Sequence, residues 1–286
     1  MPTQPNEFER AMVPLLVIEG GKVDDKNDPG GRTNQGVTQK VYSAWRKNSK
    51  LPSRDVYAMT PSERDAIYRA QYWDRIQGDK LPAGIGYVVF DGAVHSGVSQ
   101  SIKWLQRALA PLYKGAIDGQ IGQLTLDAIN AVNDHDSLIA KILDRRLAFL
   151  QALKTWKFYA RGWDRRIKDA LARGQAWAAG SVGPTPVYIP SAERKANLED
   201  AKVALPRAPG DLAAAGGGTI GIGVGPLLEQ AKTELAPLAA KLAYVNSIIF
   251  WLTAAGLILA AAGIAYRFYA ANQKKQLDDA LDAEVV

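Results

Sequence analysis

Residues Glu19 to Thr38 read EGGKVDDKNDPGGRTNQGVT, and the interpretation of the whole chain starts from this stretch. Glu19 ends an apolar run that begins at Val13, and two glycines follow it directly. The polar segment behind them contains the turn Asp-Pro-Gly-Gly at 28–31 and then Thr33. A helix would therefore deliver one acid to the edge of a groove, with a loop facing it. Cleavage of a glycosidic bond needs such an acid and a partner group.

The same residues also fit an ordinary helix end. Glycine readily takes the left-handed conformation that caps a helix, and Asp-Pro-Gly-Gly forms a turn in many settings. The spacing alone leaves both a catalytic acid and a structural helix terminus open at Glu19.

The order EGG, DPGG and T-x-x-G-V-T resembles the glycoside hydrolase family 108 lysozymes, which are N-acetylmuramidases of phage lysis cassettes and related bacterial loci. The resemblance implies hydrolysis of peptidoglycan at the β-1,4 bond after N-acetylmuramic acid. It makes Glu19 the general acid, and the apolar helix that this residue ends is expected to raise its pKa. The Glu-Asp-Thr order of phage-type lysozymes implies that Asp28 and Thr33 position the attacking water. Lys22 departs from the family, which usually has an aromatic residue after EGG.

Two other functions stay open. A lytic transglycosylase needs only one acid, and its products carry anhydromuramoyl ends instead of reducing ends. A non-enzymatic alternative is a membrane-anchored module that binds the wall, in which Glu19 does no chemistry.

The amino-acid composition excludes several kinds of active site and binding partner. The 286 residues include no cysteine, which excludes disulfides, thiol nucleophiles and Cys-ligated zinc. His95 and His135 are isolated in the sequence, so no metal site and no cofactor are expected. The net charge of +6 suits an anionic polymer such as cell-wall glycan. Nucleic acid is not an expected partner, because no basic arm or recognised binding motif is present.

Helical periodicity runs through the first 179 residues. Asn6 can cap a helix that reaches Ile18, although Pro14 predicts a kink or a later start. The residues TPSE at 60–63 form a strong helix start. We expect an all-α, lysozyme-like body, in which residues 1–92 form the muramidase segment.

Residues 93–179 are expected to complete this body. WLQRAL at 104–109 with DGQIGQLT at 118–125 resembles the predicted peptidoglycan-binding segment that accompanies family 108. The residues GWDRR at 162–166 match the closing signature of the family. The segment could bind the wall independently, or serve only to finish the helical body.

Four further side chains are candidates for contact with the glycan: Gln35, Tyr72, Trp73 and His95. Aromatic rings stack on sugar faces, but large aromatic residues mostly pack in cores, so both roles stay open for Tyr72 and Trp73. His95 is either structural or part of the groove lining. Asp91 lies on an apolar stretch, which favours a buried structural carboxylate bonded to backbone or arginine over a second catalytic acid.

The composition changes at Gly180. Residues 180–241 are rich in Pro, Ala and Gly and predict a flexible tether. Residues 242–266 contain no charged residue and predict a single transmembrane helix, since a helix of that length spans ~37 Å. A buried hairpin or an oligomerisation helix is the alternative. Residues 267–286 form a short charged tail.

Lys and Arg near the two ends of the apolar segment weakly favour a cytoplasmic C-terminus. This predicts a single-pass protein of the bacterial cytoplasmic membrane, with the catalytic domain facing the periplasm and the wall. Residues 1–10 do not resemble a secretion signal, so this orientation requires another export route. The sequence leaves the oligomeric state open.

Overall fold

The computed structural model describes residues 6–23, 31–202, 265–266 and 268–281. The chain divides into two units, and the first, which comprises residues 1–202 and 280–282, contains all the elements named below. The described residues of the second unit, 265–266 and 268–279, are helical. The α-helices of the first unit are α1 (Glu7–Glu19), α2 (Gln39–Asn48), α3 (Pro61–Tyr68), α4 (Ile85–Ser96), α5 (Val98–Ala108), α6 (Gln123–Asn130), α7 (His135–Gln151) and α8 (Trp156–Ala178).

Helix α1 carries Glu19 as its last residue. Asn6 caps its start, as the sequence predicts, and the Glu9 side chain completes a capping box with it. The helix starts at Glu7 and continues through Pro14 to Glu19, so the later start predicted at that proline was wrong. Proline lacks only one backbone donor, and Pro14 is buried with the apolar face of the helix. Gly20 then ends the helix with a φ of +73°.

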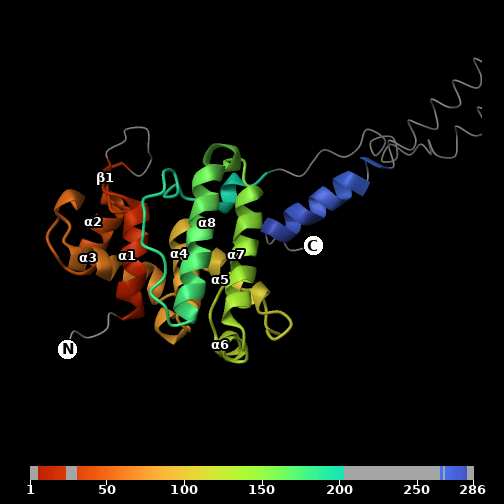
Figure 1. Cartoon of the computed structure of the whole chain (residues 1–286). Coiled ribbons are helices and arrows are strands. Elements are labelled where there is room, and N and C mark those ends of the chain that lie inside the picture. Colours follow the sequence, from red (N-terminus) through yellow and green to blue (C-terminus); the bar gives the residue numbers. More distant parts are fainter. Residues whose placement is uncertain (1–5, 24–30, 203–264, 267, 282–286) are drawn as a thin grey trace, which may run out of the picture. The chain divides into compact units, whose positions relative to one another are not determined.

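Helix α4 lies at the centre of the helical body (Figure 1). Every residue from Ile85 to His95 is buried. Helices α1, α5, α7 and α8 all pack against it. A helix that is apolar on all sides belongs in such a surrounded position. The expected boundary between residues 92 and 93 falls inside this one helix.

The segment after α1 forms a small antiparallel sheet in place of a plain loop. Its strands are β1 (Lys22–Val23), β2 (Thr33–Asn34) and β3 (Val37–Thr38), in the order β1-β2-β3. Thr33 pairs with Thr38, and Val23 pairs with Thr33. The fold is therefore mostly helical with a few strand residues. The all-α prediction missed this sheet because two-residue strands carry too little periodicity to be recognised.

Three short turns lie between α2 and α4, and a fourth follows α8. The first three are the 3₁₀ turn η1 (Val56–Ala58), the π-helical turn η2 (Arg69–Trp73) and the 3₁₀ turn η3 (Gly78–Lys80), and the fourth is the 3₁₀ turn η4 (Leu198–Asp200). The Thr60 capping box that starts α3 is present as predicted.

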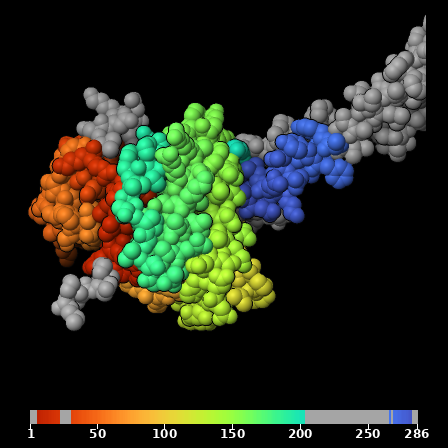
Figure 2. All heavy atoms as spheres, viewed as in Figure 1, coloured from red at the N-terminus to blue at the C-terminus, as the bar shows by residue number. Residues whose placement is uncertain are grey.

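Residues 180–202, called the strap below, lie against the helical body. Ile189, Ala192 and Ala196 are 5%, 0% and 0% exposed, and the first two pack with Ile18 of α1. Leu153 forms an isolated antiparallel bridge with Ala201. Figure 2 shows the strap in teal, covering the surface between α1 in red and α8 in green. Residues 180–202 thus belong to the packed body and do not form the flexible tether that their composition predicts.

The predicted transmembrane segment, 242–266, lies outside the described residues except for its last two positions. Within the described part of the chain, no helix has both the length and the apolar character needed to cross a membrane.

Candidate active site

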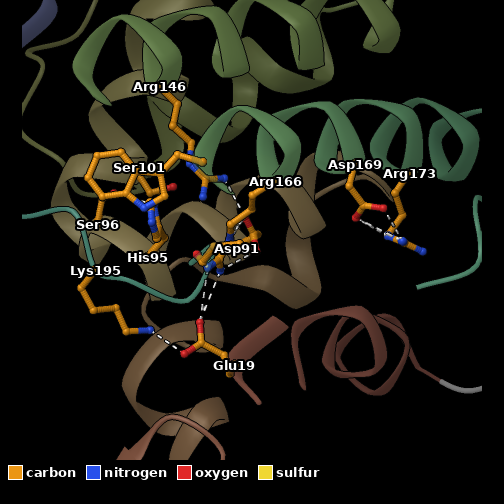
Figure 3. A network of polar contacts seen from close by, with 12 residues as sticks. Glu19, Asp91, His95, Ser96, Ser101, Arg146, Arg166, Asp169, Arg173 and Lys195 are labelled. Atoms are coloured by element: carbon orange, nitrogen blue, oxygen red, sulfur yellow. Dashed lines mark hydrogen bonds and ion pairs between the residues drawn. The ribbon is translucent and has the colours of Figure 1, made fainter. Parts of the chain in front are cut away.

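Glu19 ends α1 inside the protein. The residue is 6% exposed, and its two carboxylate oxygens contact cations from different parts of the chain. Oε2 accepts a hydrogen bond from the Lys195 ammonium of the strap at 2.7 Å. Oε1 lies 3.4 and 3.5 Å from the two terminal nitrogens of Arg166 on α8 (Figure 3). The acid is therefore held between α8 and the strap.

Arg166 belongs to a buried charge network formed by Glu19, Asp91, Arg146 and Arg166. Its guanidinium donates to Asp91 at 2.8 and 3.0 Å and to the backbone oxygen of Ala192 at 2.7 Å. Arg146 of α7 donates to the other oxygen of Asp91 at 2.6 Å. Burial by itself would raise the pKa of Asp91, but the two arginines hold it well below its usual range. Asp91 is thus the buried, arginine-bonded structural carboxylate that the sequence predicts.

A pocket of about 470 Å³ opens beside Glu19, a volume in the usual range for small-ligand sites. One wall comes from the N-terminal part of the chain and contains Glu19, Thr33, Gly36 and Thr38. The opposite wall comes from the α7–α8 junction and the strap and contains Thr155, Tyr159, Glu193, Arg194, Lys195, Asn197 and Asp200.

Gly36 shows how closely the sheet approaches the acid. Its φ of +76° is unfavourable for residues with a Cβ atom. A Cβ here would lie 2.3 Å from the Tyr68 hydroxyl and 2.8 Å from Glu19 Oε2. The glycine therefore permits the backbone of the β2–β3 turn to lie directly against the carboxylate.

The structure brings together two of the three predicted catalytic residues. Glu19 and Thr33 line the same pocket. The Thr33 hydroxyl donates to the backbone oxygen of Gly31 at 3.1 Å, which holds it within the loop. Asp28 lies outside the described residues.

Gln35 and Tyr72 lie near the acid without lining the pocket. Gln35 has a φ of +50°, and its side-chain oxygen accepts from Arg64 at 3.0 Å. Its backbone oxygen accepts from the Tyr68 hydroxyl at 2.9 Å. Burial and then the charge of Glu19 raise the pKa of Tyr72, so this phenol remains protonated close to the carboxylate.

Trp73 occupies the core. It is 1% exposed and packs edge-on against Phe8 and Phe90, with centroid distances of 5.6 and 5.3 Å. Its indole nitrogen donates to Asp79 at 2.8 Å. Of the two roles open for Trp73, the geometry gives it packing.

His95 fixes the strap in place. The ring is 1% exposed, lies edge-on to Trp163, and its Nε2 atom is 2.8 Å from the backbone oxygen of Arg194. Burial, followed by the positive charges of Arg166 and Arg146, lowers its pKa well below the usual value. The ring is therefore neutral, and its Nε2–H donates to that carbonyl. This contact gives His95 a structural role, one of the two predicted alternatives.

Sequence reasoning missed the strap side of the site. Arg166 lies in the GWDRR signature, so the motif marked it without indicating its partner. Lys195 is one basic residue in a segment with the composition of a linker, and no spacing rule connects it with Glu19. Thr155 and Tyr159 were likewise part of an amphipathic helical region without a distinguishing motif.

The described residues were also compared with the side-chain clusters that bind metal ions. Across residues 6–23, 31–202 and the described helical tail, no group of three His, Asp or Glu side chains gathers in a geometry that could hold a metal ion.

Comparison with known proteins places this site in a family context. Residues 13–97 match the glycosyl hydrolase 108 family, and residues 100–168 match the family described as a predicted peptidoglycan domain. The structure is similar to that of SagA from Brucella abortus, at 37% sequence identity and a TM-score of 0.52. That similarity covers 60% of this chain and 95% of the SagA chain. No curated protein sequence matches the chain.

Proposed function

We propose that this chain, which belongs to the glycosyl hydrolase 108 family and is a glycoside hydrolase acting on peptidoglycan, is a muramidase with Glu19 as its general acid. The proposed reaction is hydrolysis of the β-1,4 bond between N-acetylmuramic acid and N-acetylglucosamine. It would serve cell-wall degradation in host lysis or wall remodelling.

The position of Glu19 carries this proposal. Its carboxylate is buried on one wall of the pocket, within the segment that matches the hydrolase family. A carboxylic acid in such a place can protonate the oxygen of the leaving sugar while the surrounding protein excludes bulk water. A glycan strand lying in the pocket would bring its glycosidic oxygen to this acid.

Thr33 and Asp28 are the proposed partners that position water. Thr33 lines the pocket with Glu19, which supports its part in the proposal. If Asp28 acts as a base, the distance between the two carboxyl groups decides the stereochemistry: roughly 6.5–9.5 Å leads to inversion, and about 5–5.5 Å leads to retention.

The proposal is tested by product analysis with the full-length chain. Purified peptidoglycan is digested by the parent and by Glu19→Gln, and the products are identified by mass spectrometry. We expect reducing muramic acid ends from the parent and a rate lower by about 10²–10⁴-fold in the variant. Glu7→Gln, in the exposed first turn of the same helix, is the matched control and should keep the parent rate.

The other functions give different outcomes. Anhydromuramoyl ends would assign the protein to the lytic transglycosylases. Binding to the wall without any product from the parent would leave a non-catalytic binding module. Full activity of a folded Glu19→Gln variant would remove Glu19 from the acid role.

We further propose that residues 242–266 anchor the protein in the bacterial cytoplasmic membrane, with the enzyme facing the periplasm and the wall. The support is the sequence alone, since these residues include no charge and most of them lie outside the described structure. Protease protection of the two ends in spheroplasts would test this orientation.

A further inference from the structure

Lys195 differs from Arg166, the other cation that contacts Glu19. Its side chain is 38% exposed, whereas that of Arg166 is 1% exposed. Among the described residues, Glu19 is the one hydrogen-bond and ion-pair partner of its ammonium. Arg166, in contrast, is held by Asp91 and by the Ala192 carbonyl, and it stands farther from Glu19. Lys195 can therefore leave the carboxylate, while Arg166 cannot.

The backbone on both sides of Lys195 is fixed. The carbonyl of Arg194 accepts hydrogen bonds from the Trp163 indole at 2.9 Å and from the His95 ring at 2.8 Å. The Ala196 N–H donates to the His95 carbonyl at 3.1 Å. The strap thus presents the ammonium at a defined position, and a long, flexible side chain is the only part that needs to move.

The charge state of Glu19 creates a conflict with its proposed role. A general acid must carry a proton when it acts. The 2.7 Å contact with the ammonium is a charge-assisted hydrogen bond, which is strongest with the ionised carboxylate and is weakened when the carboxyl group is protonated or when a sugar oxygen takes that position.

We propose that Lys195 is a positioning residue for the catalytic acid: it pairs with ionised Glu19 in the free enzyme and leaves when glycan enters the pocket and Glu19 becomes protonated. This inference rests on the proposed function of Glu19. It assigns a role in the site to a segment, 180–202, that lies beyond both family matches.

Other groups also act on Glu19, and they remain in place when Lys195 is changed. Those facing the carboxylate from the helices are Tyr68, Tyr72 and Arg166, with Asp91 behind Arg166. The remaining charged groups in the described pocket are Glu193, Arg194 and Asp200. All of these groups are present in both the parent and the variants. A difference in the pH dependence of hydrolysis between them is therefore caused by the change at Lys195.

The test is the pH dependence of peptidoglycan hydrolysis by the full-length parent, Lys195→Met and Lys195→Gln, with Lys195→Arg as the variant that keeps the charge. An opposite charge within hydrogen-bonding distance favours the ionised form of an acid. We expect the alkaline limit of activity to move to higher pH in both neutral variants, because they lack the ammonium that contacts Glu19 at 2.7 Å. Lys195→Arg should keep the limit of the parent.

An unchanged alkaline limit in folded neutral variants would overturn the inference. Loss of folding in both neutral variants would overturn it too, because Lys195 would then hold the strap instead of serving the acid. The proposed function fails separately, through an active Glu19→Gln variant. If Glu19→Gln is inactive and the limit does not move, the general acid stands and only the role of Lys195 is lost.

Discussion

Asp91→Asn is the substitution that tests the buried charge network most directly. The Asp91 side chain is 0% exposed and joins Arg146 and Arg166, which come from different helices. Asparagine keeps the size but removes the charge and one acceptor oxygen. The Nε and Nη2 atoms of Arg146 already have no hydrogen-bond partner within the described residues. The substitution would therefore leave this guanidinium buried without its counter-charge.

The size of the effect follows from that geometry. Removal of one partner from a buried ion pair costs about 3–5 kcal/mol, since the remaining charge stays buried and unpaired. Asp91 pairs with two arginines, so we expect a loss near the upper end, about 5 kcal/mol. Domains of this kind have a total free energy of unfolding of roughly 5–15 kcal/mol. Asp91→Asn should therefore retain a free energy of unfolding of roughly 0–10 kcal/mol, which makes a large loss of stability measurable.

Urea unfolding monitored by circular dichroism measures this loss of stability. The unfolding midpoints of parent and variant are compared where the slopes of their unfolding free energies against urea concentration are similar. The control is Asp164→Asn on α8, where the partner Lys168 is 73% exposed and the pair contributes about 0–1 kcal/mol. If the two variants lose equal, small amounts of stability, the buried network does not hold the helices as described.

The difference in free energy of unfolding between the parent and Asp91→Asn should depend on pH in a defined direction. The pKa of Asp91 is lower in the folded chain than its ordinary value of 3.8. The stabilisation by ionised Asp91 is therefore fully present above about pH 4 and is lost as the pH falls through the folded-state pKa. The difference in free energy of unfolding between the parent and Asp91→Asn should stay constant from about pH 7 to 5 and decrease only in stronger acid.

Two more predictions concern the walls of the pocket. A chain that ends at Lys202 should keep its activity. A chain that ends at Ala179 lacks Lys195 and the side chains that cover Ile18. It should hydrolyse peptidoglycan about 10²-fold more slowly, because a small misplacement of a catalytic group usually costs that much. Equal rates for the two purified fragments would contradict a role of the strap. Gly36→Ala should lower the free energy of unfolding by about 1–3 kcal/mol, because the new Cβ meets Tyr68 and Glu19 at a positive φ. Gly21→Ala, with no atom within 4 Å of the added carbon, should stay within about 0.5 kcal/mol, and equal melting of the two variants would contradict the close approach at Gly36.

The sequence predicts the parts of this fold that depend on local signals. The capping residues Asn6 and Thr60 lie where the helices begin, because their side chains bond to donors only three residues away. The end of α1 at Glu19 is equally local, since Gly20 takes the positive φ that stops the helix. Glu19 and Thr33 could be identified as site candidates for the same reason, because they belong to one short motif.

The parts that the sequence did not predict depend on contacts between distant residues. The strap is held by backbone carbonyls of Ala192 and Arg194 and by small apolar side chains, and backbone groups leave no trace in composition. Because these backbone contacts cannot be seen in the composition, a segment rich in Pro, Ala and Gly predicts a tether. Lys195 and Glu19 are 176 positions apart, so no periodicity could pair them.

The balance of charge explains why the strap contributes a lysine and the helix an arginine. Two arginines and two carboxylates compensate one another in the buried network while Glu19 is ionised. Protonation of Glu19 leaves the network with one excess positive charge, and an ammonium kept at 2.7 Å would add a second in a place largely closed to water. Arg166 cannot relieve this excess, because its bonds to Asp91 and Ala192 fix it in the interior. Lys195 can, since its side chain already reaches solvent, and the proposed withdrawal would leave Glu19 beside the fixed guanidinium alone.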